Sequence, residues 1–454
     1  MTNQLNYIET PAHDFIIVLN TFSKINRRQI TQSLQITNLN ITSWNEITIN
    51  NCVFNEEVVL KELNIKKSIR FSNCTFSKRF NLTRLNSLNT VFENCIFEQY
   101  ISFKEVNSDS IRFKNCTFNN YKLTQLHEFS CQNFYFLNNS LKSDIHFKPT
   151  EVKRIILEGS ESNNLITISY LNRNQIIDEI LLLTYQGYKT EYFIRNLSTK
   201  KLQIAGEIKD SSIILSRVAI GTAILENFSN FGNFKITDLE ALDHKSNIIL
   251  KNSNLGKVQV SSIDFSKFKR ILINNTNIME IIPVNINWCF KNIYSESLTA
   301  KKENFRQLKL INQKNEDIDS KLKYEKYEMH TFLKLSRENK GDFKDKFILI
   351  TNYLSNDFGL SWTRSILILF IFSIICYTLI KIQLGHIYFH KELIADEIGY
   401  FLNFVNPVHL FEKIFPITKN DSTNGAVLID SLAKIINAYL IFQLVSAFRK
   451  YSKK

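Results

Sequence analysis

The chain has 454 residues, 44% of them apolar, and its 56 Lys and Arg against 43 Asp and Glu give a formal net charge of +13. Only 11 glycines and 5 prolines occur, which excludes a collagen-like or disordered chain. The sequence carries no zinc-finger or RNA-recognition signature, and a protein that imitates DNA would be acidic, so we do not expect nucleic acid as a partner. We expect the positive charge to face a membrane instead.

Residues 1–33 are expected to form an N-terminal cap. Their apolar run, Phe15 to Leu19, is too short for a secretory leader and lacks the charged flank that a leader carries. We therefore expect the N-terminal region to lie in the cytosol and its thiols to be reduced.

A repeat organises residues 34–285. Its signature is two apolar residues two positions apart, then any residue, Asn, a small residue, any residue and a large apolar residue. The small position is held by Cys52, Cys74, Cys95 and Cys116, which are 22, 21 and 21 residues apart. Alternation predicts strands with one inward face, and units of fixed period bury their apolar faces by stacking on one another. We therefore expect a mainly β chain with a β-helix solenoid of roughly eleven coils, each rising ~4.8 Å.

The repeat continues where cysteine is lost. Later units carry, at the small position, Asn139, Ser160, Ser253 and Thr276. The segment from Leu34 to Ile41 matches the same pattern and is interpreted as a short first coil. In the fourth unit the spacing places Tyr121 and Leu123 at the next pair of inward positions. From about residue 172 to about residue 245 the register is poor, although Ile213 to Leu215 still resembles a strand.

The four cysteines have two interpretations. Stacked thiolates could bind a metal, because sulfur is a soft ligand. Against a metal, no histidine repeats beside them and the sequence has no Cys-x2-Cys pair. Free cysteine also packs as a small apolar side chain, and its replacement by Asn, Ser and Thr indicates a requirement for size. We therefore expect these four positions to be core slots without a metal ion.

The asparagine before each small residue is expected at a turn. Asn tolerates left-handed backbone geometry and bonds to nearby backbone, and stacked copies could form a ladder. A ligand-binding row of asparagines is the alternative.

The sequence around these positions resembles that of the pentapeptide-repeat family. Asn precedes Cys-x-Phe, and the pairs Phe71/Phe76 and Phe92/Phe97 are five residues apart. In that family a small residue and a large apolar residue two positions later both point inward. The resemblance implies a right-handed β-helix of quadrilateral cross-section over residues 34–285.

Residues 286–360 are expected to be an α-helical linker. Apolar residues at helical spacing, such as Phe305 and Ile311, precede a break at Asn315 to Asp317, which predicts a helical hairpin. Two segments resemble the helical linker of bacterial membrane-bound pentapeptide-repeat proteins: Glu303 to Lys309 and Tyr324 to Met329.

Residues 361–454 are expected to form a membrane domain. Transmembrane helices are predicted at about 363–382 and 426–448, close to the ~20 residues that cross a bilayer, with an external loop at 383–425. Arg364 and the basic tail from Arg449 indicate that both termini are cytoplasmic. With the resemblance, this implies a multi-pass protein of the bacterial inner (plasma) membrane.

Asp430, Lys434 and Asn437 form a candidate polar face of the second membrane helix, at spacing i, i+4, i+7. Polar groups deep in a bilayer are costly and often functional. The alternative, which we favour, is that Asn437 bonds to the neighbouring helix while Asp430 and Lys434 pair with each other.

The order of elements in residues 361–454 is that of a two-helix ion-channel subunit: a membrane helix, an amphipathic stretch from Ile398 to Val405, a loop and a second membrane helix. Two further segments, Asn352 to Gly359 and Asn406-Pro407-x-His409, also resemble the membrane-bound pentapeptide-repeat group. Some members of that group are described as channel-like. No Thr-Val-Gly-Tyr-Gly filter follows the amphipathic stretch, so ion selectivity is not implied.

The sequence has no enzyme signature: no phosphate-binding glycine loop, no His-Glu-x-x-His pair and no nucleophile elbow. We expect no catalytic residue and no cofactor. Two functions stay open. One is a membrane-anchored scaffold or sensor whose cytoplasmic β-helix binds a protein partner. The other is an oligomeric, ion-channel-like or membrane-disrupting effector, for instance in anti-phage defence, gated by the β-helix.

Overall fold

The computed structural model describes residues 7–21, 24–41, 46–159, 164–170, 175–338, 343–385, 394–415 and 424–452. Two compact units make up the chain, Met1–Glu296 and Ser297–Lys454. Strands account for 45% of the residues, which confirms the prediction of a mainly β chain.

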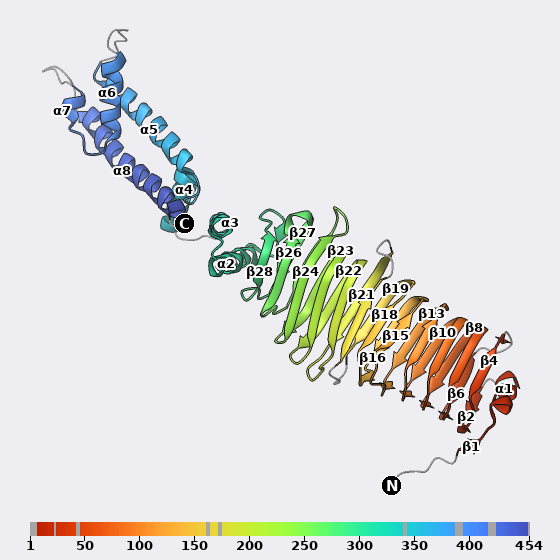
Figure 1. Cartoon of the computed structure of the whole chain (residues 1–454). Helices are drawn as coiled ribbons and strands as arrows, with labels where there is room; N and C mark the ends of the chain where they lie inside the picture. The colour runs from red at the N-terminus through yellow and green to blue at the C-terminus, as the bar shows by residue number, and fades with distance from the viewer. Residues whose placement is uncertain are drawn as a thin grey trace. The chain divides into compact units, whose positions relative to one another are not determined.

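The first unit is a β-solenoid of about 12 turns whose strands run parallel (Figure 1). Short strands stack in one column: β1 (Ile8–Glu9), β3 (Arg28–Ile30), β7 (Val53–Phe54), β9 (Thr75–Phe76), β11 (Ile96–Phe97), β14 (Thr117–Phe118) and β17 (Ser140–Leu141). The remaining sides of the first coils are β2 (Lys24–Asn26), β4 (Leu34–Thr37), β5 (Asn40–Ile41), β6 (Glu46–Asn50), β8 (Val58–Ser72), β10 (Phe80–Glu93), β12 (Ile101–Lys104), β13 (Val106–Lys114), β15 (Thr124–His127), β16 (Phe129–Leu137), β18 (Ile145–Lys148) and β19 (Glu151–Glu158).

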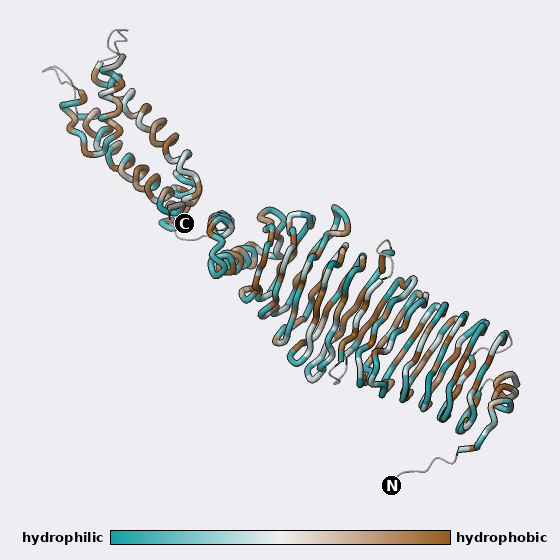
Figure 2. Tube along the Cα trace, in the orientation of Figure 1, coloured by the Kyte–Doolittle hydropathy of each residue, from teal (hydrophilic) through white to brown (hydrophobic). Residues whose placement is uncertain are grey.

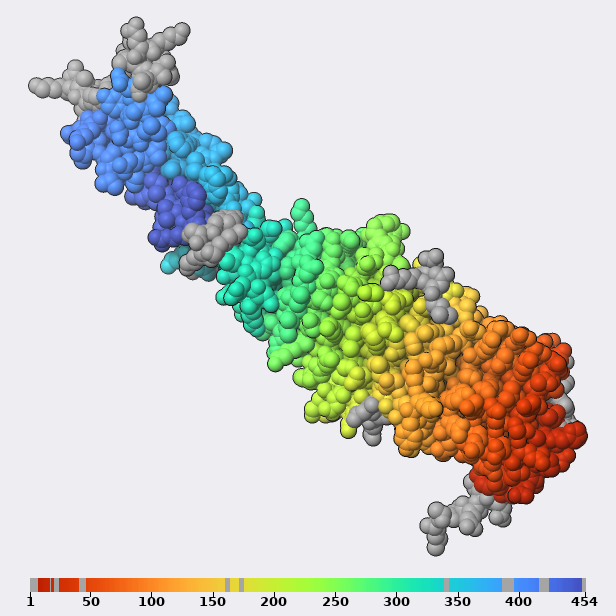
Figure 3. All heavy atoms as spheres, in the orientation of Figure 1, coloured from red at the N-terminus to blue at the C-terminus, as the bar shows by residue number. Residues whose placement is uncertain are grey.

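The later coils contain β20 (Leu165–Ser169), β21 (Ile176–Thr184), β22 (Glu191–Ile208), β23 (Ser212–Asn230), β24 (Asn233–Ala241), β25 (Asn247–Lys251), β26 (Val258–Asp264), β27 (Arg270–Asn274), β28 (Ile282–Asn287) and β29 (Ile293–Tyr294). A short 3-10 helix, Phe265–Lys267, follows β26. Figure 3 shows the colours of the solenoid succeeding one another from red to green, because each coil lies on the coil before it.

Equivalent residues of successive coils lie directly above one another. Phe71 pairs with Phe92, and Phe92 with Phe113, so their rings stack with centroids 5.2 and 4.9 Å apart. Inward positions alternate with outward ones, which Figure 2 shows as brown and teal segments along each strand. The core is therefore a set of aromatic and aliphatic columns parallel to the solenoid axis.

The cysteine column lies inside the solenoid. Cys52, Cys74, Cys95 and Cys116 are fully buried. The Cys74, Cys95 and Cys116 thiols donate to backbone carbonyls of the preceding coil, with sulfur–oxygen distances of 3.3, 3.3 and 3.4 Å. Burial raises the pKa of Cys74 and Cys95, so these thiols stay protonated. Asn139, Ser253 and Thr276 are buried as well, while Ser160 lies outside the described residues.

The turn asparagines adopt the left-handed geometry that the sequence predicts. Their φ angles run from 44 to 52° at Asn51, Asn73, Asn94, Asn115, Asn138, Asn252 and Asn275. Side-chain amides join neighbouring copies: Nδ2 of Asn94 donates to Oδ1 of Asn73 at 3.1 Å, and Nδ2 of Asn138 to Oδ1 of Asn115 at 3.2 Å. The ladder thus fixes one corner of the coils.

A second left-handed corner changes the assignment of the first coil. Glu62 and Arg84 have φ of 57 and 52°, and Asn38, at 56°, stacks below Glu62. Leu34 pairs with Val58 and not with Ile69, so the segment from Leu34 is the later half of a coil that opens at β2. The sequence pattern gives the wrong position for this segment because Asn occurs at both left-handed corners.

The fourth coil also differs from the prediction. Tyr121 is 82% exposed and Leu123 is exposed, whereas Thr124 and Leu126 pair with the inward Ile145 and Phe147 of the next coil. Cys116 and Asn139 are 23 residues apart, two more than the usual period, and the extra residues form a surface turn before β15.

Between residues 175 and 245 the solenoid continues in register, although the sequence pattern fades there. Strand β22 pairs with β23 from Glu191/Ser212 to Ile208/Asn230. The long strands bend at left-handed residues, one of which is Gly206 with φ of 101°. A Cβ at Gly206 would lie 1.6 Å from the carbonyl oxygen of Thr184, so glycine is required there.

The solenoid extends beyond the predicted range of 34–285 at both ends. Its first paired strand is β1, which pairs with β3, and it is capped by α1 (Ala12–Thr21), whose Phe15 ring packs edge-on against Phe54 at 5.7 Å. It ends with β29, which pairs with β27.

The second unit is helical. Its elements are α2 (Leu298–Lys314), α3 (Ile318–Glu338), α4 (Phe343–Asn356), α5 (Trp362–Gln383), α6 (Ile394–Val405), α7 (Phe411–Ile414) and α8 (Asn424–Ser452). Helices α2 and α3 form the predicted hairpin, with the break after Lys314. Helices α5 and α8 are long and apolar enough to cross a membrane, and they cover the two predicted transmembrane segments.

Candidate functional site in the helical unit

Helices α5 and α8 pack side by side in opposite directions (Figure 1). Trp362 near the start of α5 stacks on Phe448 near the end of α8, with ring centroids 5.4 Å apart. At the other end, Leu384 and Ala426 share a buried cluster. Only 28% of the most apolar stretch of each helix is buried, so most of their apolar side chains face outward. Exposed examples are Leu367, Ile371 and Ile375 on α5 and Leu428, Ile435 and Phe442 on α8.

The seam between the two helices contains a buried polar contact. Oγ of Ser373 donates to Oδ1 of Asn437 at 3.1 Å, and both side chains are fully buried. Nδ2 of Asn437 has no hydrogen-bond partner among the described residues. Asn437 therefore connects α8 to α5, which is the interhelical role that the sequence analysis favoured.

Asp430 and Lys434 pair as predicted, and a third residue joins them. Nζ of Lys434 lies 2.7 Å from Oδ2 of Asp430, and Nε2 of His409 lies 2.7 Å from Oδ1. The side chains of Asp430 and His409 are buried. Two polar groups, one from α8 and one from the turn before α7, thus meet around the Asp430 carboxylate.

Both ring nitrogens of His409 lie within hydrogen-bond distance of an oxygen atom. Its Nδ1 lies 2.6 Å from the carbonyl oxygen of Asn406, while Nε2 faces the Asp430 carboxylate. A neutral imidazole has one N–H and cannot donate to both oxygens. The sequence alone does not place His409 beside Asp430. It shows this residue only within the segment that resembles the membrane-bound pentapeptide-repeat group.

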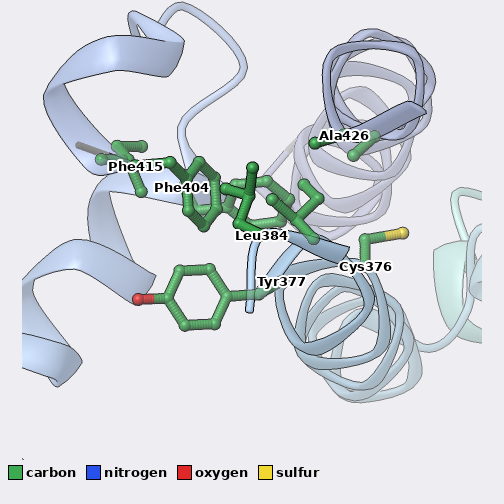
Figure 4. Close-up of a cluster of buried hydrophobic side chains, with 9 residues drawn as sticks. Cys376, Tyr377, Leu384, Phe404, Phe415 and Ala426 are labelled. Atoms are coloured by element: carbon green, nitrogen blue, oxygen red, sulfur yellow. The ribbon is translucent and has the colours of Figure 1, made fainter. Parts of the chain in front are cut away.

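A cluster of apolar side chains adjoins this polar cluster, and its Phe404 ring centroid lies 5.3 Å from that of His409. Tyr377 of α5 and Leu384, which follows α5, lie beside Phe404 of α6 and Phe415 after α7 (Figure 4). The Tyr377 hydroxyl is 3.1 Å from Oε2 of Glu397, which also pairs with Lys381. Helix α6 is therefore held against the end of α5 by rings and by one shared carboxylate.

The opposite end of the helix pair is joined to α4 by a second polar network. Oδ1 of Asn352 accepts from the Tyr439 hydroxyl and from Nε2 of Gln443, both at 3.1 Å. Nδ2 of Asn356 donates to Oε1 of Gln443 at 2.6 Å. These residues are 87 to 91 positions apart, so no local spacing in the sequence could reveal the network.

Helix α3 reaches the same end of α8. Nζ of Lys450 lies 3.3 Å from Oε1 of Glu325 and donates to the carbonyl of Phe358 at 3.0 Å. Asp357, beside Phe358, pairs with Lys326 and with Nε2 of His330 at 3.1 Å. The linker hairpin and the end of α8 are thus connected by ion pairs through the α4–α5 turn.

The arrangement can hold two helices in a fixed register and carry a small number of buried charges. Within the described residues, no three His, Cys, Asp or Glu side chains are grouped so as to hold a metal ion. Comparison with protein-family models, curated proteins and solved structures finds no match to this chain. The function is therefore argued from the geometry of the two units.

Proposed function

We propose that the chain is a membrane-anchored protein whose helices α5 and α8 cross the bilayer and whose solenoid is a cytoplasmic scaffold or sensor for a protein partner. The supporting observation is that only 28% of the most apolar stretch of each helix is buried, which leaves an outward-facing apolar surface on both. Soluble monomers rarely expose a continuous apolar patch of more than a few hundred Å². Lipid is the cover that fits a pair of helices of this length.

The charges support an orientation with both termini in the cytoplasm. Arg364, Arg449 and Lys450 lie at the end of the helix pair that carries Trp362 and Phe448. Positive residues favour the cytoplasmic side and aromatic residues the interface. The resemblance to membrane-bound pentapeptide-repeat proteins supports a bacterial inner membrane. A reporter fused after Lys454 is expected to read cytoplasmic, and a periplasmic reading would reverse the orientation.

Anchoring is tested by extracting cell membranes with alkaline carbonate. The full chain is expected to stay with the membrane. Ile371→Lys places a charge at the middle of the outward face of α5, where insertion costs about 3 kcal/mol, and is expected to release a large part of the protein. Asn403→Lys on the exposed side of α6 is the matched control. Release of the unmodified chain by carbonate contradicts the proposal.

The second candidate is an oligomeric channel-like or membrane-disrupting effector. It is favoured by α6, whose Phe404 packs inward while Ile398 and Leu402 stay exposed and available for contact with further copies. The contact of Lys450 with Glu325 offers a route by which the cytoplasmic part could act on α8. Two helices cannot enclose a water-filled pore, so conduction requires several copies. Oligomeric state in detergent and conductance in planar bilayers test this function, and a strict monomer without conductance excludes it.

A further inference from the structure

Helix α4 has two apolar faces, and only one of them is covered. Leu349, Ile350 and Tyr353 pack in a cluster with Leu333 of α3 and with Phe358. On another face Phe343, Phe347 and Leu354 fall within one narrow stripe at about 100° per residue, and they are 51 to 78% exposed. The Phe343 and Phe347 rings stack on one another, with centroids 6.4 Å apart.

Contacts fix α4 beside the ends of the two apolar helices. Asn352 bonds to Tyr439 and Gln443 of α8, as described above, and the guanidinium of Arg364 on α5 lies 5.0 Å from the ring centre of Tyr353. These contacts place α4 at the same end of the helix pair as the stacked rings of Trp362 and Phe448. Interfacial aromatic residues mark the depth of the lipid headgroups.

The composition of α4 fits that depth. Lys344 and Lys346 stand beside Phe343 and Phe347, so cations flank the exposed rings. A helix with one apolar face and flanking lysines binds in the plane of an anionic membrane surface, with its apolar face among the upper acyl chains. Continuity with the apolar surface of α5 and α8 favours lipid over a protein as the cover of this face.

We infer that α4 is an interfacial membrane helix, whose face formed by Phe343, Phe347 and Leu354 enters the cytoplasmic leaflet of a bilayer that contains anionic lipid. The inference rests on the proposed membrane anchoring of α5 and α8. Through Asn352 and Asn356, the depth of α4 in the leaflet fixes the position of α8 at its Gln443 turn. The occupant of the exposed face is thus the lipid itself.

The test uses the full chain in vesicles of phosphatidylcholine with phosphatidylglycerol. The described cysteines are all buried, so a nitrobenzoxadiazole probe labels an added cysteine selectively. Phe347→Cys and Leu354→Cys report on the exposed face of α4. Asp345→Cys, on the other side of the same helix, is the matched control, and Ile371→Cys reports on the middle of α5.

Shallow spin-labelled lipid is expected to quench the Phe347→Cys and Leu354→Cys probes and to leave the Asp345→Cys probe accessible to aqueous iodide, while deep spin label quenches the Ile371→Cys probe. If Ile371→Cys is quenched and the two α4 probes behave like Asp345→Cys, anchoring stands and the inference fails. If no probe is quenched by lipid, the proposed function fails. Excimer emission from pyrene at Phe347→Cys would show that a second copy covers the face, which also overturns the inference.

Discussion

Oγ of Ser373 and Oδ1 of Asn437 form a 3.1 Å hydrogen bond between α5 and α8, with both side chains fully buried. Asn437→Ala should weaken the helix pair by roughly 1 kcal/mol, a usual size for one interhelical hydrogen bond in a membrane protein. The measurement is thermal unfolding of the full chain in detergent, followed by helical circular dichroism. In the double variant with Ser373→Ala the loss should be less than the sum of the single losses. Additive losses would contradict a direct bond.

Asp430→Asn should destabilise the turn that carries His409 and the start of α8. Removing one partner of a buried charge cluster costs about 3 kcal/mol, because the remaining charges stay desolvated. Amide hydrogen exchange in α7 and in the first turns of α8 is expected to accelerate. Lys434→Met is the control with a smaller effect, since the Lys434 side chain is partly exposed. Equal protection in Asp430→Asn and the unmodified chain would show that the cluster contributes nothing.

His146 should make the solenoid less stable in acid. Burial, followed by the charges of Lys148 and Arg195, lowers its pKa from 6.5 to about 4. In the unfolded chain the ring takes a proton near its usual pKa, whereas in the folded protein it stays neutral until the pH is lower. The free energy of unfolding therefore has its full value above pH 6.5 and falls as the pH drops toward 4. The loss is up to about 3 kcal/mol, at about 1.4 kcal/mol per pKa unit. Urea unfolding followed by β-sheet circular dichroism at pH 7.5 and 4.5 measures it.

His146→Gln is the control for this pH dependence. It keeps a polar side chain near Ser169, whose Oγ lies 2.8 Å from Nε2 of His146, but it cannot titrate. The variant should lose clearly less stability between the two pH values than the unmodified chain. An unchanged pH dependence would assign the effect to other groups, among them His127, whose pKa burial also lowers.

Asn73→Ala should destabilise the solenoid by about 1 kcal/mol or more, because an alanine at φ of 52° is strained. The substitution also removes the bond from Nδ2 of Asn73 to Oδ1 of Asn50 and the bond that Asn73 accepts from Asn94. Asn73→Gly loses the same side-chain bonds without the strain, so its melting temperature should lie above that of Asn73→Ala. The reverse order would contradict a conformational role of this corner.

The cysteine column should hold no metal. Elemental analysis of the purified chain is expected to find no stoichiometric zinc, and iodoacetamide should alkylate none of the four thiols until the protein is unfolded, since they are fully buried. One zinc ion per chain would overturn the packing interpretation. Cys95→Ala is the companion variant: it keeps a small residue in the slot and should retain the fold.

Features set by neighbouring residues in the sequence could be predicted. The 21-residue spacing of the cysteines gave the solenoid, Asn before a small residue gave the left-handed corner, and apolar length gave α5 and α8. The errors at Leu34 and Tyr121 arose because Asn fits either corner, and because an inserted turn shifts the inward positions without changing the residue types.

Contacts between distant elements could not be predicted. The i, i+4 pair of Asp430 and Lys434 follows from helix geometry, but His409 reaches Asp430 only through the packing of α6 and α7 on α5. The bonds of Asn352 and Asn356 to α8 depend on the relative rotation of two helices, which no periodicity in a single helix encodes.

The register of the stacked corners makes the solenoid modular in length. Asn73 and Asn94 are equivalent residues one coil apart, and their side chains bond directly. Removing residues 74–94 would join Asn73 to Cys95 and leave every column continuous, with one layer fewer. Whole-coil gains and losses are therefore the changes that lineage divergence or protein engineering can make most readily, and they alter the reach of the domain while each remaining layer keeps its neighbours.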